Sequence, residues 1–436
     1  MKRNQLRLAT RISIQLRWLG FSVLERLSSA PETRSQSLAN SEPMAALWVF
    51  VSTIGELNAI APFLRQLIEQ HPQLQLILLT DRNIYRAAYL AQYPTAQVIE
   101  IGASSKQARE LSQQYPPELF IIAEIPCLPS DAPCRLPFAY LLQAKRAGAV
   151  IALINGWIYG YEASCRIDLV ERTLLGRSYL QLIDVLCVQT AAVAKILTQA
   201  GANPVNVHIT GNIKFDALAG VVRPWGATRS PHILQSIELS GRPVLVAGCV
   251  TESSELELVL DAFVSLLGHN PQSLLILAPR HPENNDAMQS LFSAAQSRKL
   301  NYRSRHVDGD QAVPDSIQLL ILDTMGELHD FYGRAQIAHV GRDHNVLEPI
   351  SLGKPVTVRP NWNDSYPSFP VFSLTQAAAL LNVADDAATL CTHWLASIER
   401  GPASSQNISK TISHLTGASI LCQQFVAQAI SGSRAR

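Results

Sequence analysis

Four short segments carry polar side chains where catalytic or phosphate-binding groups are common. In the first, residues 51–60 (VSTIGELNAI), an apolar run passes through a turn into a helical pattern. Gly55 permits a tight turn, and Glu56 then falls in the first turn of the expected helix. A carboxylate there can accept a proton from an attacking hydroxyl group that lies within hydrogen-bonding reach. The alternative is an ordinary first-turn glutamate stabilised by the helix dipole.

Two further segments place cationic side chains or amide groups where a strand is expected to meet a helix. Residues 278–285 (APRHPENN) present Arg280 and His281 at the end of an apolar run, a frequent position for phosphate contacts. Residues 321–332 (ILDTMGELHDFY) pass through Gly326 into a helix whose first amide groups could meet an anion. Basic residues and glycines also occur at many ordinary helix ends, so neither segment is decisive alone.

The fourth segment, residues 340–356 (VGRDHNVLEPISLGKPV), crowds polar groups at the start of a short helix. Asn345 and Glu348 are three residues apart and therefore project from one helix face. A carboxylate in that place suits the two hydroxyl groups of a ribose, whereas the same spacing also fits a helix cap begun by Asn345. His344 has no second metal ligand at a usual spacing, so no metal site is predicted.

Composition limits the class of protein. The 436 residues suffice for two domains, and 47% hydrophobic with 16% charged residues is typical of a folded chain. Lys plus Arg total 36 and Asp plus Glu total 35, so the net charge of +1 argues against a nucleic-acid-binding protein. Seven scattered cysteines include no CxxC pair, which argues against both a zinc site and a disulfide framework.

The elements that must position these side chains form two α/β sets. Buried parallel strands are predicted at 47–52, 74–79, 118–125, 149–155 and 184–190, and again at 243–248, 273–279, 317–323, 335–341 and 355–358, with helices between them. We assign 46–222 to an N-terminal domain, 223–242 to an irregular interdomain linker, 243–410 to a C-terminal domain and 411–436 to a helix that crosses back. Two doubly wound, Rossmann-like domains facing a central cleft are the GT-B architecture.

Residues 1–45 precede the first domain and predict a basic amphipathic helix followed by a linker. Six basic residues and one acidic residue occur before residue 27, and no uncharged apolar run exceeds the seven residues 18–24. That run is too short to span a membrane. At helical spacing, one apolar stripe is formed by Leu8, Ile12, Leu16, Leu19, Val23 and Leu27, and Arg3, Arg7 and Arg11 form a basic stripe away from it. Such a helix suits a membrane surface, and the alternatives are packing on the domain behind it or a transit-like extension.

Together and in this order, these segments resemble the 3-deoxy-D-manno-octulosonic acid (Kdo) transferases, GT-B enzymes that transfer Kdo from CMP-Kdo to the lipid A precursor lipid IVA. The resemblance covers about 45–420. It rests on STIGE (52–56), TGNIKFD (210–216), PRHPE (279–283), DTMGEL (323–328) and HNVLEPISLGKPV (344–356).

The resemblance implies a role for each matched position. Glu56 is similar to the family's proton acceptor, and Glu124 and Lys214 are similar to residues that stabilise the transition state. The CMP-binding segments correspond to Pro279, Arg280, Met325, Gly326, Glu327, Asn345, Val346, Leu347 and Glu348. The family resemblance further implies an inverting reaction without a metal or other cofactor, CMP-Kdo and the lipid A precursor as substrates, a role in lipopolysaccharide synthesis, and a peripheral location on the cytoplasmic face of the bacterial inner membrane.

The chain departs from the family pattern mainly on the acceptor side. Around Glu124 the family's second glutamate and its tryptophan are replaced by Pro126 and Leu128, and an Asn-Ala-Arg segment reads Asn-Gly-Trp at 155–157. Two alternatives therefore stay open. One is a transferase of the same family with another acceptor or another CMP-activated acidic sugar, and the other is a non-catalytic relative that binds a nucleotide.

Overall fold

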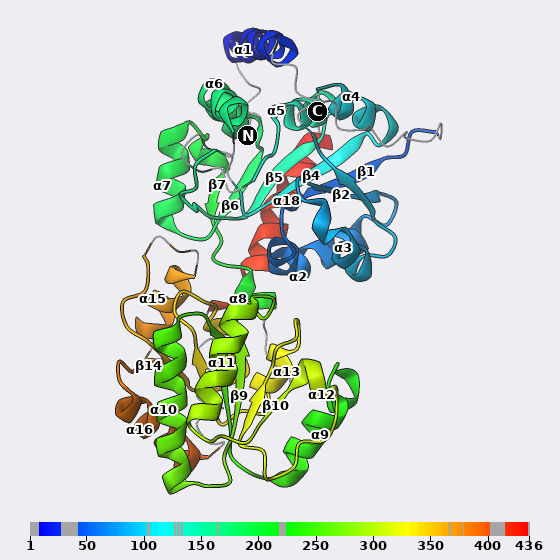
Figure 1. The fold of residues 1–436 in the computed structure, drawn as a ribbon. Helices are drawn as coiled ribbons and strands as arrows, with labels where there is room; N and C mark the ends of the chain where they lie inside the picture. Colours follow the sequence, from blue (N-terminus) through cyan, green and yellow to red (C-terminus); the bar gives the residue numbers. More distant parts are fainter. Residues whose placement is uncertain are drawn as a thin grey trace. The chain divides into compact units, whose positions relative to one another are not determined.

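The computed structural model describes residues 8–27, 42–102, 105–125, 128, 131, 134–163, 165–217, 224–364, 366, 368–377, 379–401 and 415–434. The chain divides into two compact units (Figure 1). The first comprises Met1–Ala217 with Leu415–Arg436, and the second comprises Leu218–His414. Each unit is built on a seven-stranded parallel sheet, which confirms the predicted pair of doubly wound α/β domains.

The sheet of the first unit has the strand order β3-β2-β1-β4-β5-β6-β7. Its strands are β1 (Ala46–Phe50), β2 (Gln75–Thr80), β3 (Gln97–Glu100), β4 (Pro117–Ala123), β5 (Val150–Gly156), β6 (Val185–Val188) and β7 (Val207–Ile209). Its helices are α1 (Leu8–Leu27), α2 (Ile54–Gln70), α3 (Arg86–Gln92), α4 (Ser105–Gln114), α5 (Phe138–Arg146), α6 (Arg166–Leu182), α7 (Ala191–Ala200), α8 (Lys214–Ala217) and α18 (Ala418–Arg434), with short 3₁₀ turns at Asn83–Tyr85 and Pro204–Asn206.

Helices cover both faces of this sheet because its central strands, β1, β4 and β5, are largely apolar and buried. In β1, Trp48 and Phe50 face a core shared with α4, α5, α6 and α7, whereas Leu47 and Val49 face a core shared with α2, α3 and α18. Such two-sided burial is what an unbroken apolar run predicts for a parallel sheet. Asp216 accepts hydrogen bonds from the amides of Gly417 and Ser419 at 2.6 and 2.5 Å, so α18 is tied directly to the first unit.

Helix α1 has two apolar faces. Ile14, Trp18 and Phe21 are buried on the first unit, where the rings of Trp18 and Phe138 lie 5.7 Å apart. The predicted apolar stripe points outward instead, because Ile12, Leu16, Leu19 and Val23 are 51–63% exposed. The side chains of Leu8 and Leu27 and the predicted basic stripe lie outside the described residues. No helix in the described part of the chain is both long and apolar enough to cross a membrane.

The sheet of the second unit has the order β10-β11-β9-β8-β12-β13-β14. Its strands are β8 (Val244–Val250), β9 (Leu274–Pro279), β10 (Tyr302–Ser304), β11 (Leu319–Ile321), β12 (Ile337–Val340), β13 (Val356–Val358) and β14 (Leu381–Val383). Its helices are α9 (Pro231–Ser240), α10 (Ser253–His269), α11 (Asn285–Ser297), α12 (Arg305–Asp308), α13 (Leu328–Tyr332), α14 (Leu347–Ser351), α15 (Phe369–Ala377) and α16 (Ala387–Arg400), with a 3₁₀ turn at Trp225–Ala227. One apolar core joins α10, α11 and α16 to the sheet.

The segment predicted as an irregular linker, 223–242, contains helix α9, so that expectation is wrong for residues 231–240. Pro231 opens the helix, and the amides of His232 and Ile233 donate to the carboxylate of Asp310 at 3.1 and 3.0 Å. Ile233 and Leu234 are buried within the second unit. The segment is ordered because tertiary contacts, rather than a strong helical periodicity, hold it in place.

Candidate active site

Glu56 lies directly after β1 at the carboxyl end of the first sheet. Thr53 caps α2, and the amide of Glu56 donates to the Thr53 hydroxyl oxygen at 3.3 Å. In return, the Glu56 carboxylate accepts the amides of Ser52 and Thr53 at 2.6 and 3.4 Å. This reciprocal arrangement is a capping box, which supports the structural interpretation of Glu56, and its role as a base stays a prediction.

Glu124 follows β4, the strand beside β1, and reaches the same edge of the sheet. It is 1% exposed and adopts a positive φ of 60°, a backbone conformation that is uncommon for a residue other than glycine. Asn155, at the end of β5, also has a positive φ of 59°. Its amide nitrogen donates to Glu124 Oε1 at 2.8 Å. Two neighbouring strand ends therefore have backbone geometries that bring a carboxylate and an amide together.

Lys214 completes this group from the first position of α8, which follows β7. Its ammonium group lies 3.0 Å from Glu124 Oε1, and the lysine side chain is one-third exposed whereas that of Glu124 is buried. The lysine is held from behind, because Asn155 Oδ1 accepts the amide of Ile213 at 2.9 Å and Asn212 Oδ1 accepts the amide of Lys214 at 2.9 Å. The three acceptor-half residues predicted from sequence, Glu56, Glu124 and Lys214, thus converge at one sheet edge.

The two carboxylates have different electrostatic surroundings. Burial raises the pKa of Glu56 from 4.5 to about 8, and the charge of Glu124 adds to this rise. Glu124 is also buried but accepts hydrogen bonds or an ion pair from Asn155, Lys214 and Tyr159. A carboxyl group whose pKa is raised in this way, as that of Glu56 is, can take up a proton near neutral pH.

The sequence analysis did not identify Tyr159 and Asp131 as site residues. The Tyr159 hydroxyl donates to Glu124 Oε2 at 2.5 Å, and the Asp131 carboxylate accepts the amides of Tyr159, Gly160 and Tyr161 at 3.0, 2.8 and 3.3 Å. Neither residue belongs to a strand–turn–helix pattern. An aspartate followed 28 residues later by a tyrosine gives no local signal of their contact.

The segments that the resemblance matches to CMP binding lie at the carboxyl end of the second sheet. Two glycines permit the close approach, because a Cβ atom on Gly341 would lie 2.0 Å from the Cys249 carbonyl oxygen and one on Gly248 would lie 1.9 Å from the Tyr332 hydroxyl. Only glycine fits at these two positions. The end of β8 therefore lies directly against the start of the loop after β12 and against α13 at this edge of the second unit.

Charged groups from three loops lie at this edge. Burial raises the pKa of Glu348 to about 7. Burial raises the pKa of the Cys249 thiol to about 11, with Glu348 raising it further and Arg280 opposing. Burial and the charge of Arg280 lower the pKa of His344 to about 4. Arg280 is exposed at the end of β9, so it is the cation of this group that solvent reaches most easily.

The predicted CMP-binding residues in the loop after β12 differ in what they can offer a ligand. The side chains of Val346 and Leu347 are buried, so only their main chains could reach a ligand. Asn345 Oδ1 accepts the amide of Leu347 at 3.1 Å, but the residue that caps α14 is Val346, so the predicted cap at Asn345 is wrong. Glu348 is half-buried beside them, and Pro279 ends β9 next to Arg280.

The loop after β11 is held by hydrogen bonds to side chains from other segments. Gly326 adopts a positive φ of 84°, and the carbonyl of exposed Met325 accepts the Arg229 guanidinium at 3.2 Å. The carboxylate of Glu327 is buried and accepts the Ser230 hydroxyl and, at 3.3 Å, Arg305. Glu327 therefore serves the loop's own structure, and the sequence analysis missed the two arginines because they belong to other segments.

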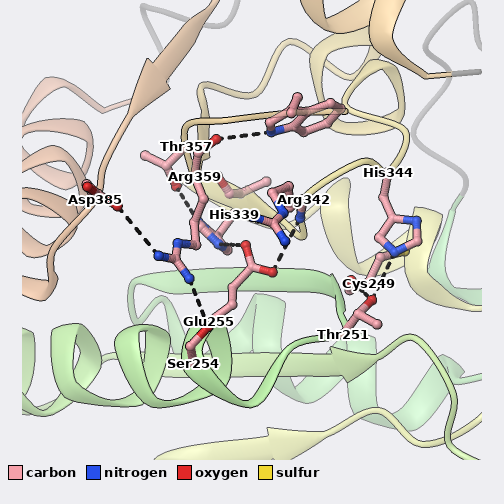
Figure 2. A network of polar contacts seen from close by, with 12 residues as sticks. Cys249, Thr251, Ser254, Glu255, His339, Arg342, His344, Thr357, Arg359 and Asp385 are labelled. Carbon is pink, nitrogen blue, oxygen red and sulfur yellow. Dashed lines mark hydrogen bonds and ion pairs between the residues drawn. The ribbon is translucent and has the colours of Figure 1, made fainter. Parts of the chain in front are cut away.

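A buried polar network supports the loop after β12 (Figure 2). Glu255, in the first turn of α10, lies 3.2 Å from His339 Nε2 and accepts the amide of Arg342 at 3.3 Å. His339 Nδ1 lies 3.2 Å from the Thr357 hydroxyl, to which the indole of Trp394 donates at 3.3 Å. Both Glu255 and His339 are fully buried, so removing either side chain leaves one buried polar atom of the other without a partner.

The His344 ring is paired with a hydroxyl group rather than with a second metal-ligating side chain. Its Nε2 lies 3.0 Å from the Thr251 hydroxyl at the same edge (Figure 2). Within the described part of the chain, no three His, Cys, Asp or Glu side chains form a group that could hold a metal ion. That the reaction needs no metal or cofactor stays a prediction.

Comparison with known proteins identifies the family. Residues 22–217 match the family model described as 3-deoxy-D-manno-octulosonic-acid transferase. The 3-deoxy-D-manno-octulosonic acid transferase of Bordetella pertussis is 31% identical over 73% of this chain and 72% of its own, and that of Aquifex aeolicus is 26% identical over 78% and 81%.

Solved structures support the fold. The UDP-GlcNAc 2-epimerase of Neisseria meningitidis is similar with a TM-score of 0.60 at 15% identity, over 88% of this chain and 100% of its own. At that identity the similarity bears on the fold alone. Two parallel doubly wound sheets, together with the sequence relatives, identify a glycosyltransferase of GT-B type. The chain belongs to the 3-deoxy-D-manno-octulosonic acid transferase family.

Proposed function

We propose that this protein transfers Kdo from CMP-Kdo to the lipid A precursor lipid IVA with inversion, and that Glu56 is the general base. The observation that carries the proposal is the pair of unequal carboxylates at the first sheet edge. The pKa of Glu56 is raised to about 8, whereas Glu124 is held by Lys214 at 3.0 Å. A base whose pKa is close to the working pH combines a useful ionised fraction with strong proton affinity.

The proposed step is a single displacement. The acceptor hydroxyl oxygen forms a bond to the anomeric carbon of Kdo while its proton passes to Glu56. The bond from that carbon to the phosphate oxygen breaks, and its electron pair leaves with CMP. Positive charge that develops on the sugar is favoured by the Glu124 carboxylate, and Lys214 offsets the negative charge of the sugar's own carboxylate or of the leaving phosphate.

The second unit offers complementary groups for the nucleotide. Arg280 is exposed at the end of β9, and Glu348 is half-buried at the neighbouring loop. A guanidinium group suits the single phosphate of CMP, and a carboxylate suits the ribose hydroxyls. Because CMP-Kdo is already activated and carries one phosphate, these groups and the amides near Gly326 are the proposed substitutes for a metal ion.

A peripheral position on the cytoplasmic face of a bacterial inner membrane accords with the outward face of α1. Three further exposed apolar side chains, those of Leu169, Val170 and Leu174, lie on α6, a helix that α1 contacts. The two helices are joined where the Arg17 guanidinium donates to the Leu174 carbonyl at 3.5 Å. A lipid acceptor requires such a surface, since its acyl chains stay in the bilayer while its sugar enters the site.

Vesicle binding tests this surface. We expect Leu16→Glu with Leu19→Glu to reduce co-sedimentation with anionic phospholipid vesicles at least roughly tenfold, because two exposed leucines lose their apolar contact. Leu239→Glu is the matched control, since Leu239 is 79% exposed but lies on α9 of the second unit. Equal sedimentation of all three proteins would contradict the proposed membrane surface.

The reaction is tested with CMP-Kdo generated in situ and a tetra-acylated lipid A precursor, with lipid products followed by mass spectrometry. The expected product gains one or more Kdo masses. A second candidate function, transfer to another acceptor, is favoured by the replacement of the family's acceptor-side residues with Pro126, Leu128 and Trp157. CMP binding without any lipid product, followed by product with another glycan acceptor, would replace the first proposal by the second.

A further inference from the structure

Tyr159 holds the Glu124 carboxylate from the side opposite Lys214. Its hydroxyl donates to Oε2 at 2.5 Å, whereas the lysine and Asn155 both contact Oε1. Each oxygen of the carboxylate therefore has its own partner, and the plane of the group is fixed. A hydrogen bond to an ionised acceptor is among the stronger ones in proteins.

The position of Tyr159 is itself determined by Asp131. The Asp131 carboxylate is fully buried and accepts three successive main-chain amides, those of residues 159–161. Its own main chain is held as well, because its amide donates to the Leu128 carbonyl at 3.2 Å and its carbonyl accepts Arg172 at 3.4 Å. Burying a carboxylate is costly unless it is hydrogen-bonded, and here its partners are the loop that carries Tyr159.

We propose that Tyr159 is a positioning residue for Glu124, held in place by Asp131, and that it stabilises the state in which Glu56 and Glu124 are both ionised. This inference rests on the proposed role of Glu56 as the base. Tyr159 lies in a loop that carries no recognisable motif. It supplies Glu124 with a hydrogen-bond donor that the chain's altered acceptor-side segments do not evidently supply.

The charged and titratable groups around these side chains agree with that role. Burial raises the pKa of Tyr159 well above its ordinary value, and the charges of Glu124, Glu56 and Asp131 raise it further. The phenol therefore stays protonated and remains a donor throughout the neutral range. Lys214 is the cation that faces Glu124, and Tyr89, whose pKa burial also raises, faces Glu56 from α3.

The pH dependence of kcat/KM distinguishes this role from a structural one. The acid limb reports the loss of the last proton from the Glu56–Glu124 pair. In Tyr159→Phe the doubly ionised state loses a donor, so we expect the acid limb to move to higher pH by roughly one unit. In Glu124→Gln the like charge is removed, so we expect the limb to move to lower pH. A variant that merely folds less well would change the amplitude and leave the limb in place.

The loop offers a matched control in Tyr161→Phe. Tyr161 stacks on Tyr159 with ring centroids 6.0 Å apart, but its ring is exposed and it reaches Asp131 only through its main-chain amide. We expect the acid limb of the kcat/KM profile of Tyr161→Phe to coincide with that of the wild type. Asp131→Asn should move the limb in the same direction as Tyr159→Phe, because it weakens the hold on the loop without removing the phenol.

Kinetics and a spectroscopic titration together separate failure of this inference from failure of the base assignment. If Glu56→Gln is inactive and Tyr159→Phe has the wild-type limb, the role of Tyr159 is overturned and the base stands. If Glu56→Gln keeps full activity, the base assignment is wrong. In that case a pH titration of the ¹³C shifts of labelled glutamate carboxyl groups tests the role of Tyr159 without turnover. The signals are assigned by difference with Glu56→Gln and Glu124→Gln. A titration midpoint of these carboxyl groups that is the same in Tyr159→Phe as in the wild type would overturn the role of Tyr159.

Discussion

Glu56→Gln is expected to stabilise the protein at alkaline pH while abolishing transfer. In the folded protein the pKa of Glu56 is raised from 4.5 to about 8, so the folded state retains a proton that the unfolded chain releases. Stability from this group is therefore complete below pH 4.5 and is lost as the pH rises toward 8. At 1.36 kcal/mol per unit, the full loss is about 5 kcal/mol. Glutamine keeps the shape and never ionises, so it escapes this loss.

Thermal unfolding at pH 5 and pH 9 measures the effect. The difference between Glu56→Gln and wild type should grow by about 4 kcal/mol between the two pH values, or on the order of 10 °C in the melting temperature of the first unit. Comparing two pH values cancels changes in packing that the substitution makes at both. Glu69→Gln is the matched control, because Glu69 is an exposed residue of the same helix, α2.

A difference that stays constant from pH 5 to pH 9 would refute the reasoning, because it would mean that Glu56 titrates as an ordinary carboxylate. A growing difference that also occurs in Glu69→Gln would show that helix α2, and not the buried site, is responsible. Loss of stability in Glu56→Gln at both pH values would indicate that the capping box with Thr53 outweighs the buried charge.

Two further predictions concern the second unit. Gly341→Ala should weaken CMP binding at least roughly tenfold in calorimetry, because its Cβ would lie 2.0 Å from the main-chain oxygen of Cys249. Gly268→Ala, in α10 with nothing within 4 Å, should bind CMP normally. Arg280→Gln should also weaken CMP binding about tenfold, and its CMP affinity should depend less on salt than that of the wild type. The substitution Arg400→Gln, at an exposed arginine, should leave CMP binding unchanged. Wild-type affinity in Gly341→Ala or Arg280→Gln would contradict the assigned nucleotide edge.

Local patterns predicted the central strands and the polar residues that follow them. Each strand expected from an apolar run is present, because a strand buried on both faces needs that composition. The edge strands β3, β7, β10 and β14 were missed, because each mixes apolar with polar and partly exposed residues and so shows no apolar run. Such short strands exist through pairing with a neighbour rather than through their own pattern.

The candidate site was predictable only where its residues follow a strand in the sequence or match a family motif. Glu56 could be recognised because an apolar strand pattern and a helix start precede it, whereas Glu124 and Lys214 were predicted from the resemblance alone. Tyr159 and Asp131 carry no signal, because their contact depends on an irregular loop. Helix α1 shows the same limit, because its outward stripe was recognised and its inward face, with Trp18, was not.

The most direct test of the central claim is Kdo transfer by wild type, Glu56→Gln and Glu69→Gln, run side by side with CMP-Kdo and the tetra-acylated lipid A precursor. Mass spectrometry should show lipid that has gained Kdo with wild type and with Glu69→Gln, and none with Glu56→Gln although it still binds CMP. Equal product from all three proteins would contradict Glu56 as the base. The absence of product from a folded, CMP-binding wild type would contradict lipid IVA as the acceptor.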